Sequence, residues 1–328
     1  MVVPTRNRRD LLDAAVRSLR RQTVGAPAVV VVDDASDTPV GPIDGVTVVR
    51  NPSALGAAGA RNRGLDEVGT PWVAFCDDDD LWAPHKLARQ LAALTAHPDT
   101  QWSYTGAVEV DAGLEIRGAQ RALASGWIFD RLLQGNAVAG GGSTVLARTD
   151  LVRAVGGFAA GLRAAEDWDL WSRMAELAPV AAVDEPLVAW RRHPANKSAT
   201  WSPADLLALE SRFRARARKR GVAFEHRYAA QAAIDHAVAS GSRGAAARAY
   251  WARFRRDRAT RDAAAAVYVL LAPGPFARTK ERAHRRSVPA AWEGELGWLA
   301  EVGADLTRST VGAAAEGTIL PVDDSPGL

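Results

Sequence analysis

Cysteine is almost missing from the chain: its 328 residues contain one, Cys76. A single cysteine cannot form an internal disulfide or a metal site of several thiolates, so disulfide-rich secreted domains and cysteine-based zinc modules are excluded. Long apolar runs are missing as well. The longest candidate, residues 263–276, is broken by prolines and a glycine before it reaches the roughly 20 residues that a membrane-spanning helix needs. Residues 1–20 are rich in charge and lack the apolar stretch typical of a signal peptide, so we expect a cytoplasmic protein.

The composition that is present is typical of a globular protein, with 48% hydrophobic and 24% charged residues. The charge is unevenly distributed. Residues 1–203 carry 21 Lys and Arg against 24 Asp and Glu, residues 205–286 carry 19 against 7, and residues 287–328 carry 1 against 7. The basic middle block predicts attraction to an anionic surface, such as the inner face of the plasma membrane. Arg-rich, solvated helices would give the same composition, so both interpretations stay open at this point.

Residues 1–110 alternate between strand patterns and helix patterns. Short apolar, β-branched runs predict strands at residues 28–33, 46–50 and 72–76. Apolar residues at helical spacing predict helices at residues 10–22, 57–68 and 84–97. This alternation favours an α/β fold in which helices flank a mixed, mainly parallel sheet.

The rest of the chain changes character near residue 200. Residues 166–177 predict a helix, and residues 179–193 predict two short strands. Beyond them the chain is rich in Ala and Arg and has a helical pattern, with "VYVLL" (267–271) as its one strand-like run. We therefore predict three parts: a first domain over residues 1–202, a helical C-terminal region over 203–310, and a disordered tail over 311–328.

Acidic residues directly follow two of the predicted strands. Asp33 and Asp34 end the strand at 28–33, and Asp77 to Asp80 follow the strand at 72–76. Ligands of such sheets bind beyond the carboxyl ends of the strands, so we expect both clusters on one rim. A third acidic pair, Glu166 and Asp167, begins the helix at 166–177, where the helix dipole favours anions.

The four adjacent aspartates admit several interpretations. An EF-hand calcium loop requires glycine at its sixth position and glutamate at its twelfth, where this chain has Trp82 and Ala88. An Asp-rich helix of the prenyl-synthase type requires a further aspartate where Leu81 stands. Two interpretations remain: a solvated turn, or an Mg²⁺ or Mn²⁺ site shared with a diphosphate. In the second, Asp77 and Asp79 alternate along an extended chain and so point to the same side.

Further segments complete a pattern in which order and spacing matter more than any single match. They are "VVPTRNR" (2–8), "VVVDDASD" (30–37), "NPSALGAAGARNRGL" (51–65), "FCDDDDLWAPHKL" (75–87), "GGSTVLAR" (141–148), "GGF" (156–158), "EDWDLWSRMA" (166–175) and "LVAWRRHPANKS" (187–198). With this ordered set the chain resembles the inverting family 2 glycosyltransferases, which have the Rossmann-like GT-A fold of nucleotide-diphospho-sugar transferases. The resemblance covers about residues 1–200.

The resemblance implies a role for each matching residue. Asp167, with Glu166 beside it, would be the catalytic base that takes the proton of the acceptor hydroxyl. Mn²⁺ or Mg²⁺ would be held by Asp79, Asp77 and His193. The nucleotide sugar would be bound by a set of residues around the same rim: Pro4, Thr5, Arg6, Asp33, Asp34, Arg61, Asn62, Asp77, Asp78 and Arg192.

These roles imply metal-dependent, inverting transfer of a sugar from a UDP or dTDP sugar to an acceptor hydroxyl, in the assembly of cell-surface polysaccharide, glycolipid or natural-product glycans. The acceptor would be a glycan, a lipid-linked glycan or a small molecule. Peripheral contact of residues 205–286 with an anionic membrane and a homodimer are further arrangements left open. No nucleic-acid partner is expected, because the basic helices come with no aromatic platform or recognition motif.

Two other functions compete with this one. A non-catalytic nucleotide-sugar-binding or scaffold protein would have no need of the acidic pair Glu166 and Asp167. A sugar-1-phosphate nucleotidyltransferase would have a Gly-rich, basic loop after its first strand, and "PTRNRRD" (4–10) contains no glycine.

Overall fold

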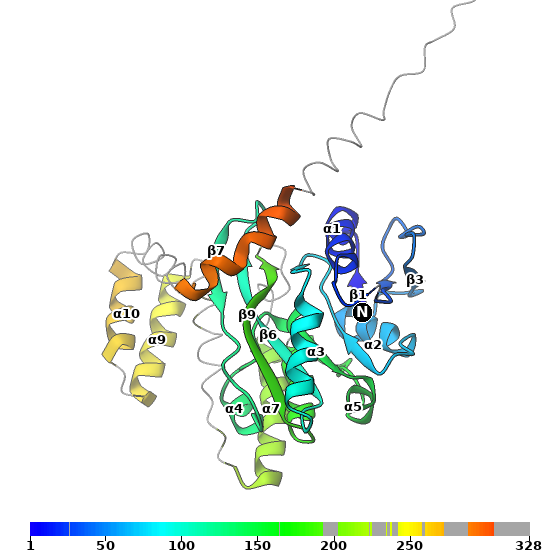
Figure 1. Ribbon diagram of the computed structural model, residues 1–328. Helices are drawn as coiled ribbons and strands as arrows, with labels where there is room; N and C mark the ends of the chain where they lie inside the picture. The colour runs from blue at the N-terminus through cyan, green and yellow to red at the C-terminus, as the bar shows by residue number, and fades with distance from the viewer. Residues whose placement is uncertain are drawn as a thin grey trace, which may run out of the picture.

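A computed structural model describes most of the chain and all of the predicted first domain except its last ten residues and two single positions. The described residues are 1–25, 27–163, 165–192, 203–222, 224, 234, 237, 242–257, 260–271 and 288–304. His193 and the tail at 311–328 lie outside them, so the predictions made for them stay predictions. Figure 1 shows a sheet with helices on both sides, and a pair of helices, α9 and α10, set apart from it.

The strands form two hydrogen-bonded groups. In the first, β1 (Val2–Thr5), β2 (Val30–Asp33) and β3 (Thr47–Arg50) are parallel in the order β1-β2-β3. The second has the order β4-β8-β6-β9-β5, with β7 beside β6, and comprises β4 (Trp72–Ala74), β5 (Leu81–Trp82), β6 (Trp102–Val110), β7 (Ile116–Gln120), β8 (Val145–Arg148) and β9 (Val180–Arg191). A parallel bridge from Val2 to Phe75 connects the two groups.

The predicted mixed sheet is confirmed, but parallel pairing dominates only among β1, β2 and β3. In the second group β6 and β9 are parallel, whereas β4 with β8, β6 with β8, β6 with β7 and β5 with β9 are antiparallel. The longest ladder among the described strands is nevertheless parallel, and it pairs β6 with β9 from Trp102 and Val180 to Val110 and Arg191.

The predicted helices of the first domain are present, and they lie on both faces of the sheet. They are α1 (Arg9–Arg20), α2 (Gly56–Asp66), α3 (Lys86–Ala96) and α6 (Glu166–Ala175), with the shorter α4 (Phe129–Gln134), α5 (Thr149–Ala154) and the 3₁₀ turn η1 (Gly141–Thr144) between them. Alternate residues of one strand face opposite layers. Val30 and Val32 pack in the cluster that holds α2 and α6, and Val31 packs in the cluster that holds α1 and α3.

Residues 179–192, the described part of this segment, contain one strand, not the two that the sequence predicts. β9 runs unbroken from Val180 to Arg191, and its register against β6 shifts at Thr105 and Gly106. The Asp184–Glu185–Pro186 segment, which has the composition of a turn, lies at this bulge. A bulge accommodates an extra residue without ending the strand, so the turn-like composition was misleading.

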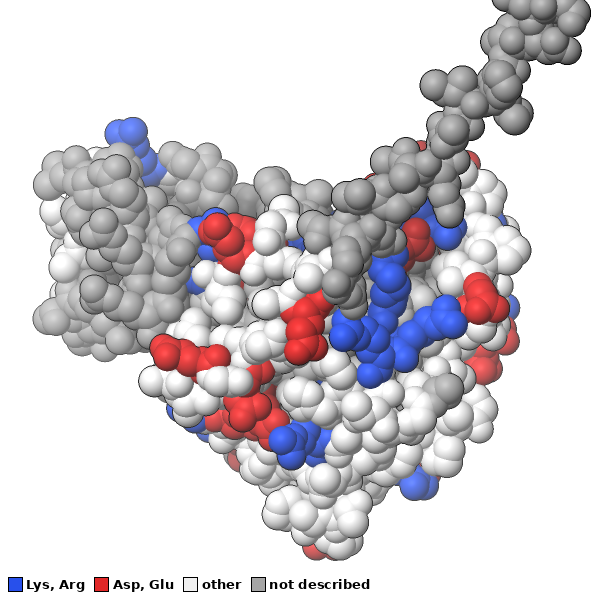
Figure 2. All heavy atoms as spheres, turned by 45° about the horizontal axis from the view of Figure 1, so that its top comes forward, with Lys and Arg blue, Asp and Glu red and all other residues white. Residues whose placement is uncertain are grey.

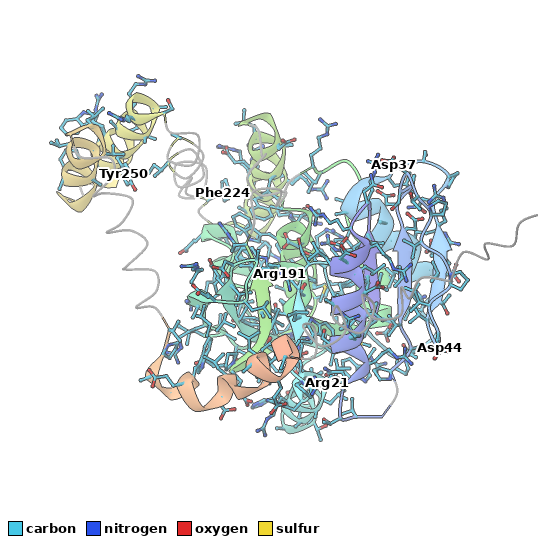
Figure 3. The ribbon with its side chains drawn as sticks, turned by 90° about the horizontal axis from the view of Figure 1, so that it is seen from above. Arg21, Asp37, Asp44, Arg191, Phe224 and Tyr250 are labelled. Atoms are coloured by element: carbon cyan, nitrogen blue, oxygen red, sulfur yellow. The ribbon has the colours of Figure 1, made fainter. Side chains whose placement is uncertain are left out.

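The helical C-terminal region does not form one separate unit. α7 (Pro203–Arg220) packs its Leu209, Phe213 and Ala217 into the main core. α9 (Arg243–Asp257) and α10 (Thr260–Leu271), which includes the strand-like "VYVLL", pack against each other in a core of their own. Figure 3 shows Tyr250 of α9 on the far side of the molecule from Asp37 and Asp44, with Arg191 between them. Every helix among the described residues is too short or too polar to span a membrane.

The chain then returns to the sheet. The turn η3 (Ala290–Leu296) and the helix over residues 297–304 lie across β9 and β7 (Figure 1). Trp292 and Trp298 are buried there, and their indole N–H groups donate to the carbonyl oxygens of Asp184 and Pro186, at 3.0 Å each. This segment therefore belongs structurally to the first domain.

Candidate active site

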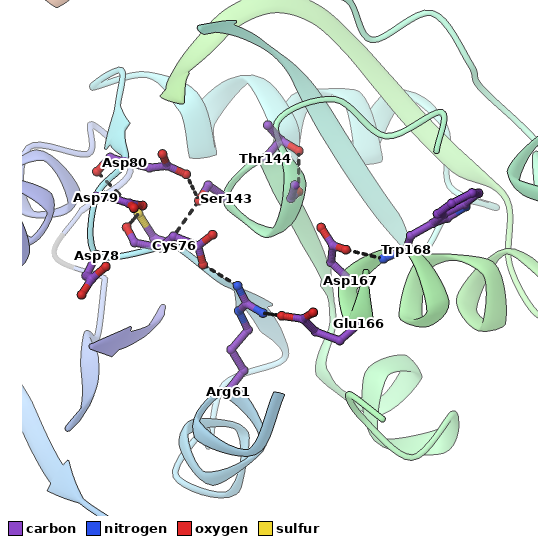
Figure 4. Close-up of polar contacts among 12 residues, drawn as sticks. Arg61, Cys76, Asp78, Asp79, Asp80, Ser143, Thr144, Glu166, Asp167 and Trp168 are labelled. Atoms are coloured by element: carbon purple, nitrogen blue, oxygen red, sulfur yellow. Dashed lines mark hydrogen bonds and ion pairs between the residues drawn. The ribbon is translucent and has the colours of Figure 1, made fainter. Parts of the chain in front are cut away.

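The Asp77–Asp80 loop and the acidic pair at the start of α6 lie on the same rim of the sheet. Arg61 of α2 joins them: its guanidinium donates to Asp77 at 2.5 Å and to Glu166 at 2.9 Å (Figure 4). Arg61 is 5% exposed, and burial of a guanidinium is tolerated when carboxylates offset its charge. The Asp77–Asp80 loop and the start of α6 are at least 86 positions apart in the chain. The buried guanidinium of Arg61 connects them at a single site.

The four aspartates differ in their surroundings. Asp80 is fully buried and accepts hydrogen bonds from the Ser143 hydroxyl at 2.5 Å and from the backbone N–H of Arg191 at 3.0 Å. Asp78 accepts a hydrogen bond from the Thr5 hydroxyl at 2.7 Å. Asp79 accepts one from Arg8 at 2.9 Å. The side chain of Asp77 is the most exposed of the four, at 32%.

The loop has the donor set of a hard divalent cation. Carboxylate oxygens of Asp77, Asp79 and Asp80 lie within 4.8 Å of one another. Burial, together with the charge of Asp79, raises the pKa of Asp78 to about 7, and the pKa of Asp80 is raised by burial and by its acidic neighbours. A cation bound by this loop would offset the repulsion that these shifts express. The residues therefore fit Mg²⁺ or Mn²⁺, with Asp80 already engaged by Ser143 and Arg191.

Asp167 has the surroundings of a general base. Burial, and then the charge of Glu166, raise its pKa to about 6, while the charge of Arg61 opposes the rise. Asp167 lies in the first turn of α6, which begins after Ala165 in the left-handed region, at φ 52°. A glycine passes close to it: a Cβ atom at Gly141 would lie 3.3 Å from its Oδ2. A side chain in place of Gly141 would therefore crowd the Asp167 carboxylate.

The last residues of β1, Pro4 and Thr5, and the loop that follows them also lie at this rim. Thr5 is buried and contacts Asp78, Pro4 is half-buried, and Arg6 is exposed. Arg8, which sequence reasoning missed, donates to both Asp78 and Asp79, at 3.2 and 2.9 Å. A signal was available, because "VVPTRNR" belongs to the matching segments and places Arg8 just beyond Thr5.

The carboxylates of Asp33 and Asp34 accept hydrogen bonds from other residues of the protein. Asp33 is 0% exposed and accepts from the backbone N–H groups of Ser36 and Val40 and from Arg50. Asp34 accepts from the Asn51 amide and from two backbone N–H groups, those of Leu55 and Gly56 at the start of α2, each at 2.8 Å. Their contacts hold together the loops that end β2 and β3. Recognition of a nucleotide base by either carboxylate therefore remains a prediction.

Two predicted binding residues have other surroundings than expected. Both polar atoms of the Asn62 amide bond to the backbone of Phe158, at 2.8 Å, so Asn62 supports the "GGF" segment. Arg192 is exposed, with its guanidinium 4.8 Å from the ring of Trp190. Its neighbour Arg191 is buried, and the charges of Asp79 and Asp80 oppose the lowering of its pKa by burial. Neighbouring strand residues face opposite sides, so the inward arginine is Arg191.

Residues 1–156 match the family model "Glycosyl transferase family 2". An uncharacterised glycosyltransferase of Haemophilus influenzae is 30% identical over 175 residues, which are 52% of this chain and 59% of that protein. The succinoglycan biosynthesis protein ExoW of Rhizobium meliloti is 36% identical over 109 residues, 29% of this chain and 34% of its own. The chain thus spans about a third to three-fifths of the length of these relatives.

The fold has a solved counterpart. A crystal structure of Staphylococcus aureus TarS 1-349 in complex with UDP-GlcNAc superimposes with a TM-score of 0.54 and 16% sequence identity, over 98% of this chain and 93% of that one. At this identity the similarity concerns the fold alone. It confirms the predicted α/β fold, in which helices flank a mixed sheet.

Proposed function

We propose that this chain, whose residues 1–156 match the glycosyl transferase family 2 model, transfers a sugar from a nucleoside-diphosphate sugar to an acceptor hydroxyl, with inversion. One observation supports this most strongly: Arg61 holds the Asp77 loop and the Glu166–Asp167 pair in one site. The group that activates the donor and the group that removes the acceptor proton must lie close enough together to act on the same bound substrates. A protein that only bound nucleotide sugars would have no use for the second group.

The residues divide the proposed reaction between them. Asp79 and Asp77 would hold the divalent cation, which when bound offsets the charge of the departing diphosphate. Asp167 would take the proton of the acceptor hydroxyl as that oxygen attacks the anomeric carbon, and the bond to the diphosphate breaks in the same displacement. A single base favours one displacement, hence inversion. Arg8 and Arg191, beside the aspartates, are the cations best placed to meet diphosphate oxygens.

Donor and acceptor are proposed by class. A UDP or dTDP sugar is the donor that we expect. One relative, from Escherichia coli and 30% identical over 100 residues, is named a UDP-Glc:α-D-GlcNAc-diphosphoundecaprenol β-1,3-glucosyltransferase, and this chain covers 40% of its length. The ExoW relative is named for succinoglycan biosynthesis. These names support a glycan or lipid-linked acceptor in cell-surface polysaccharide assembly.

A screen of nucleotide sugars tests the proposal. UDP and dTDP sugars should raise the melting temperature and be hydrolysed or transferred only when Mn²⁺ or Mg²⁺ is present. Asp79→Ala should remove both effects, whereas Asp66→Ala, an exposed acid at the end of α2, should change neither. Transfer by Asp79→Ala at the wild-type rate would contradict the assigned metal role. Release of pyrophosphate from a nucleoside triphosphate would indicate a nucleotidyltransferase, and binding without turnover a scaffold protein.

Contact with an anionic membrane through residues 205–286 stays a proposal with a narrower basis. Arg212 and Arg216 of α7, part of that basic block, are engaged by Asp169 inside the protein. On the face shown in Figure 2, acidic and basic side chains of the described residues are interspersed. A membrane contact would therefore depend on other members of the block, such as Arg248 and Arg255 of α9, which are exposed. A homodimer likewise remains a proposal.

A further inference from the structure

Asp169, two residues beyond the proposed base, is the most heavily paired carboxylate among the described residues. It is 0% exposed, and three arginines surround it. Arg173, one turn further along α6, donates at 2.9 Å, while Arg212 and Arg216 come from α7 and donate at 2.8 and 2.7 Å. Burial opposes ionisation, but the hydrogen bond from Arg212 and the three positive charges hold the pKa of Asp169 below its ordinary value. The group is therefore a stable, charged joint between the two helices.

An aromatic contact reinforces the joint next to the base. The ring of Phe213, on α7, lies edge-on to Trp168 with 4.9 Å between centroids. Trp168 directly follows Asp167 and donates its indole N–H to the carbonyl oxygen of Leu132 at 2.8 Å. The guanidinium of Arg216 lies over the Phe213 ring, 5.0 Å from its centroid. Contacts with α7 thus hold Trp168 and Asp169, the two residues that directly follow Asp167 in α6.

The start of α6 needs such support. Its N-cap is Ala165, which offers no side-chain hydrogen bond and holds a left-handed backbone conformation at φ 52°. An alanine in that conformation costs free energy that surrounding contacts must offset. The hydrogen bond of Asp167 with the N–H of its own neighbour, Trp168, at 2.7 Å, is local and does not position the turn in the fold. Contacts with the rest of the protein therefore determine where Asp167 points.

We propose that α7, through the ion pairs of Arg212 and Arg216 with Asp169 and the packing of Phe213 on Trp168, positions the Glu166–Asp167 turn for proton removal from the acceptor. This inference rests on the proposed role of Asp167. It assigns α7, which lies outside the residues that match the family model, to the catalytic unit. These are positioning residues, since their contacts reach the site through α6.

The test distinguishes a role of α7 in positioning Asp167 from a general loss of protein structure. Arg212→Ala, Arg216→Ala and the double variant are measured beside Arg218→Ala, an exposed arginine of the same helix. Transfer by the double variant should have a kcat lower by about 10- to 100-fold, the effect expected when a catalytic group is misplaced by an ångström. UDP affinity in the presence of Mn²⁺ should stay within about twofold, because Asp33, Asp34 and the Asp77 loop are untouched. Arg218→Ala should match the wild type in both.

Two further readouts separate the outcomes. The acid limb of the kcat profile should move to lower pH in the double variant, because a displaced Asp167 loses part of the burial that raises its pKa. Phe213→Leu, which keeps every ion pair, should lower kcat in the same direction by less. A double variant with wild-type kcat and pH profile overturns the inference, and so does a loss of UDP binding in proportion to kcat. If the Asp167→Asn variant transfers sugar at the wild-type rate, the proposed base is wrong. That result differs from the two outcomes that overturn the role of α7.

Discussion

We expect the proposed base, Asp167, to limit the rate of the proposed reaction at low pH. Burial and the charge of Glu166 raise its pKa to about 6, and a general base accepts a proton only when it is ionised. Below pH 6 the residue is increasingly protonated, so kcat should fall about tenfold per pH unit, and above pH 6 it should level off. Measurement of kcat at saturating donor across this range checks the expectation. A limb near pH 4, the ordinary aspartate value, would show that Asp167 is solvated or is not the base.

Arg61 is the second residue whose replacement has a specific expected result. The two terminal nitrogen atoms of its guanidinium contact Asp77 and Glu166 separately, and a lysine ammonium cannot reproduce that geometry. Arg61→Lys should lower transfer by about 100-fold and the free energy of unfolding by about 3 kcal/mol, because one buried carboxylate loses its partner. Denaturant unfolding and initial rates measure the two effects. Arg63→Lys, on the exposed face of α2, is the control and should change neither by more than about 0.5 kcal/mol or twofold.

Residue roles were harder to predict than residue types. The acidic clusters could be found from the sequence because strand ends and acid pairs are local patterns. The partners of those acids are not local: Arg61 and Glu166 are 105 positions apart. Nothing in the sequence shows that Asn62 is engaged by Phe158, or that Arg191 and not Arg192 faces inward. The orientation of Arg191 depends on the register of β9, which a pattern of apolar residues does not fix near a bulge.

At the scale of elements, the packing of α2 on β1 depends on a glycine. A Cβ atom at Gly64 would lie 2.3 Å from a methyl carbon of Val2. Alanine is favoured over glycine in a helix by about 1 kcal/mol, but the overpacking costs about 1–3 kcal/mol, so we expect Gly64→Ala to be destabilising. Chemical denaturation measures the change. Gly69→Ala, where a Cβ would meet nothing within 4 Å, should be neutral, and a stabilised Gly64→Ala would show that the helix can move away from the strand.

Most elements of residues 1–110 could be predicted, since helical and alternating patterns act over a few residues. The prediction failed where long-range pairing overrides composition. β9 continues through Asp184, Glu185 and Pro186 because β6 supplies a partner strand on one side. "VYVLL", which is apolar and β-branched, is helical because it packs on α9. In both cases the deciding contact is made with another element and not within the segment itself.

At the scale of the whole molecule, part of the predicted helical C-terminal region packs on the first domain. The segment over residues 288–304 returns to the sheet and closes its β6–β9 face with Trp292, Trp298, Leu299 and Val302. The sequence gives no period or motif that would have indicated this return. Trp292 is 3% exposed, so Trp292→Ala should lower the free energy of unfolding of the domain by about 3–5 kcal/mol. The matched control, Trp251→Ala on α9, removes a side chain that is 48% exposed and should cost far less.

A double-mutant cycle makes this prediction specific to the contact. A Cβ atom at Gly106 of β6 would lie 2.6 Å from the Trp292 ring, so Gly106→Ala should destabilise the wild-type protein by forcing the indole away. In the Trp292→Ala background the ring is gone, so the effect of Gly106→Ala should fall although the Glu185 carbonyl oxygen at 2.8 Å remains. Unfolding free energies of the four proteins give the coupling, expected at about 0.5–3 kcal/mol. Additive effects would mean that the Trp292 ring does not lie against Gly106 of β6 in solution.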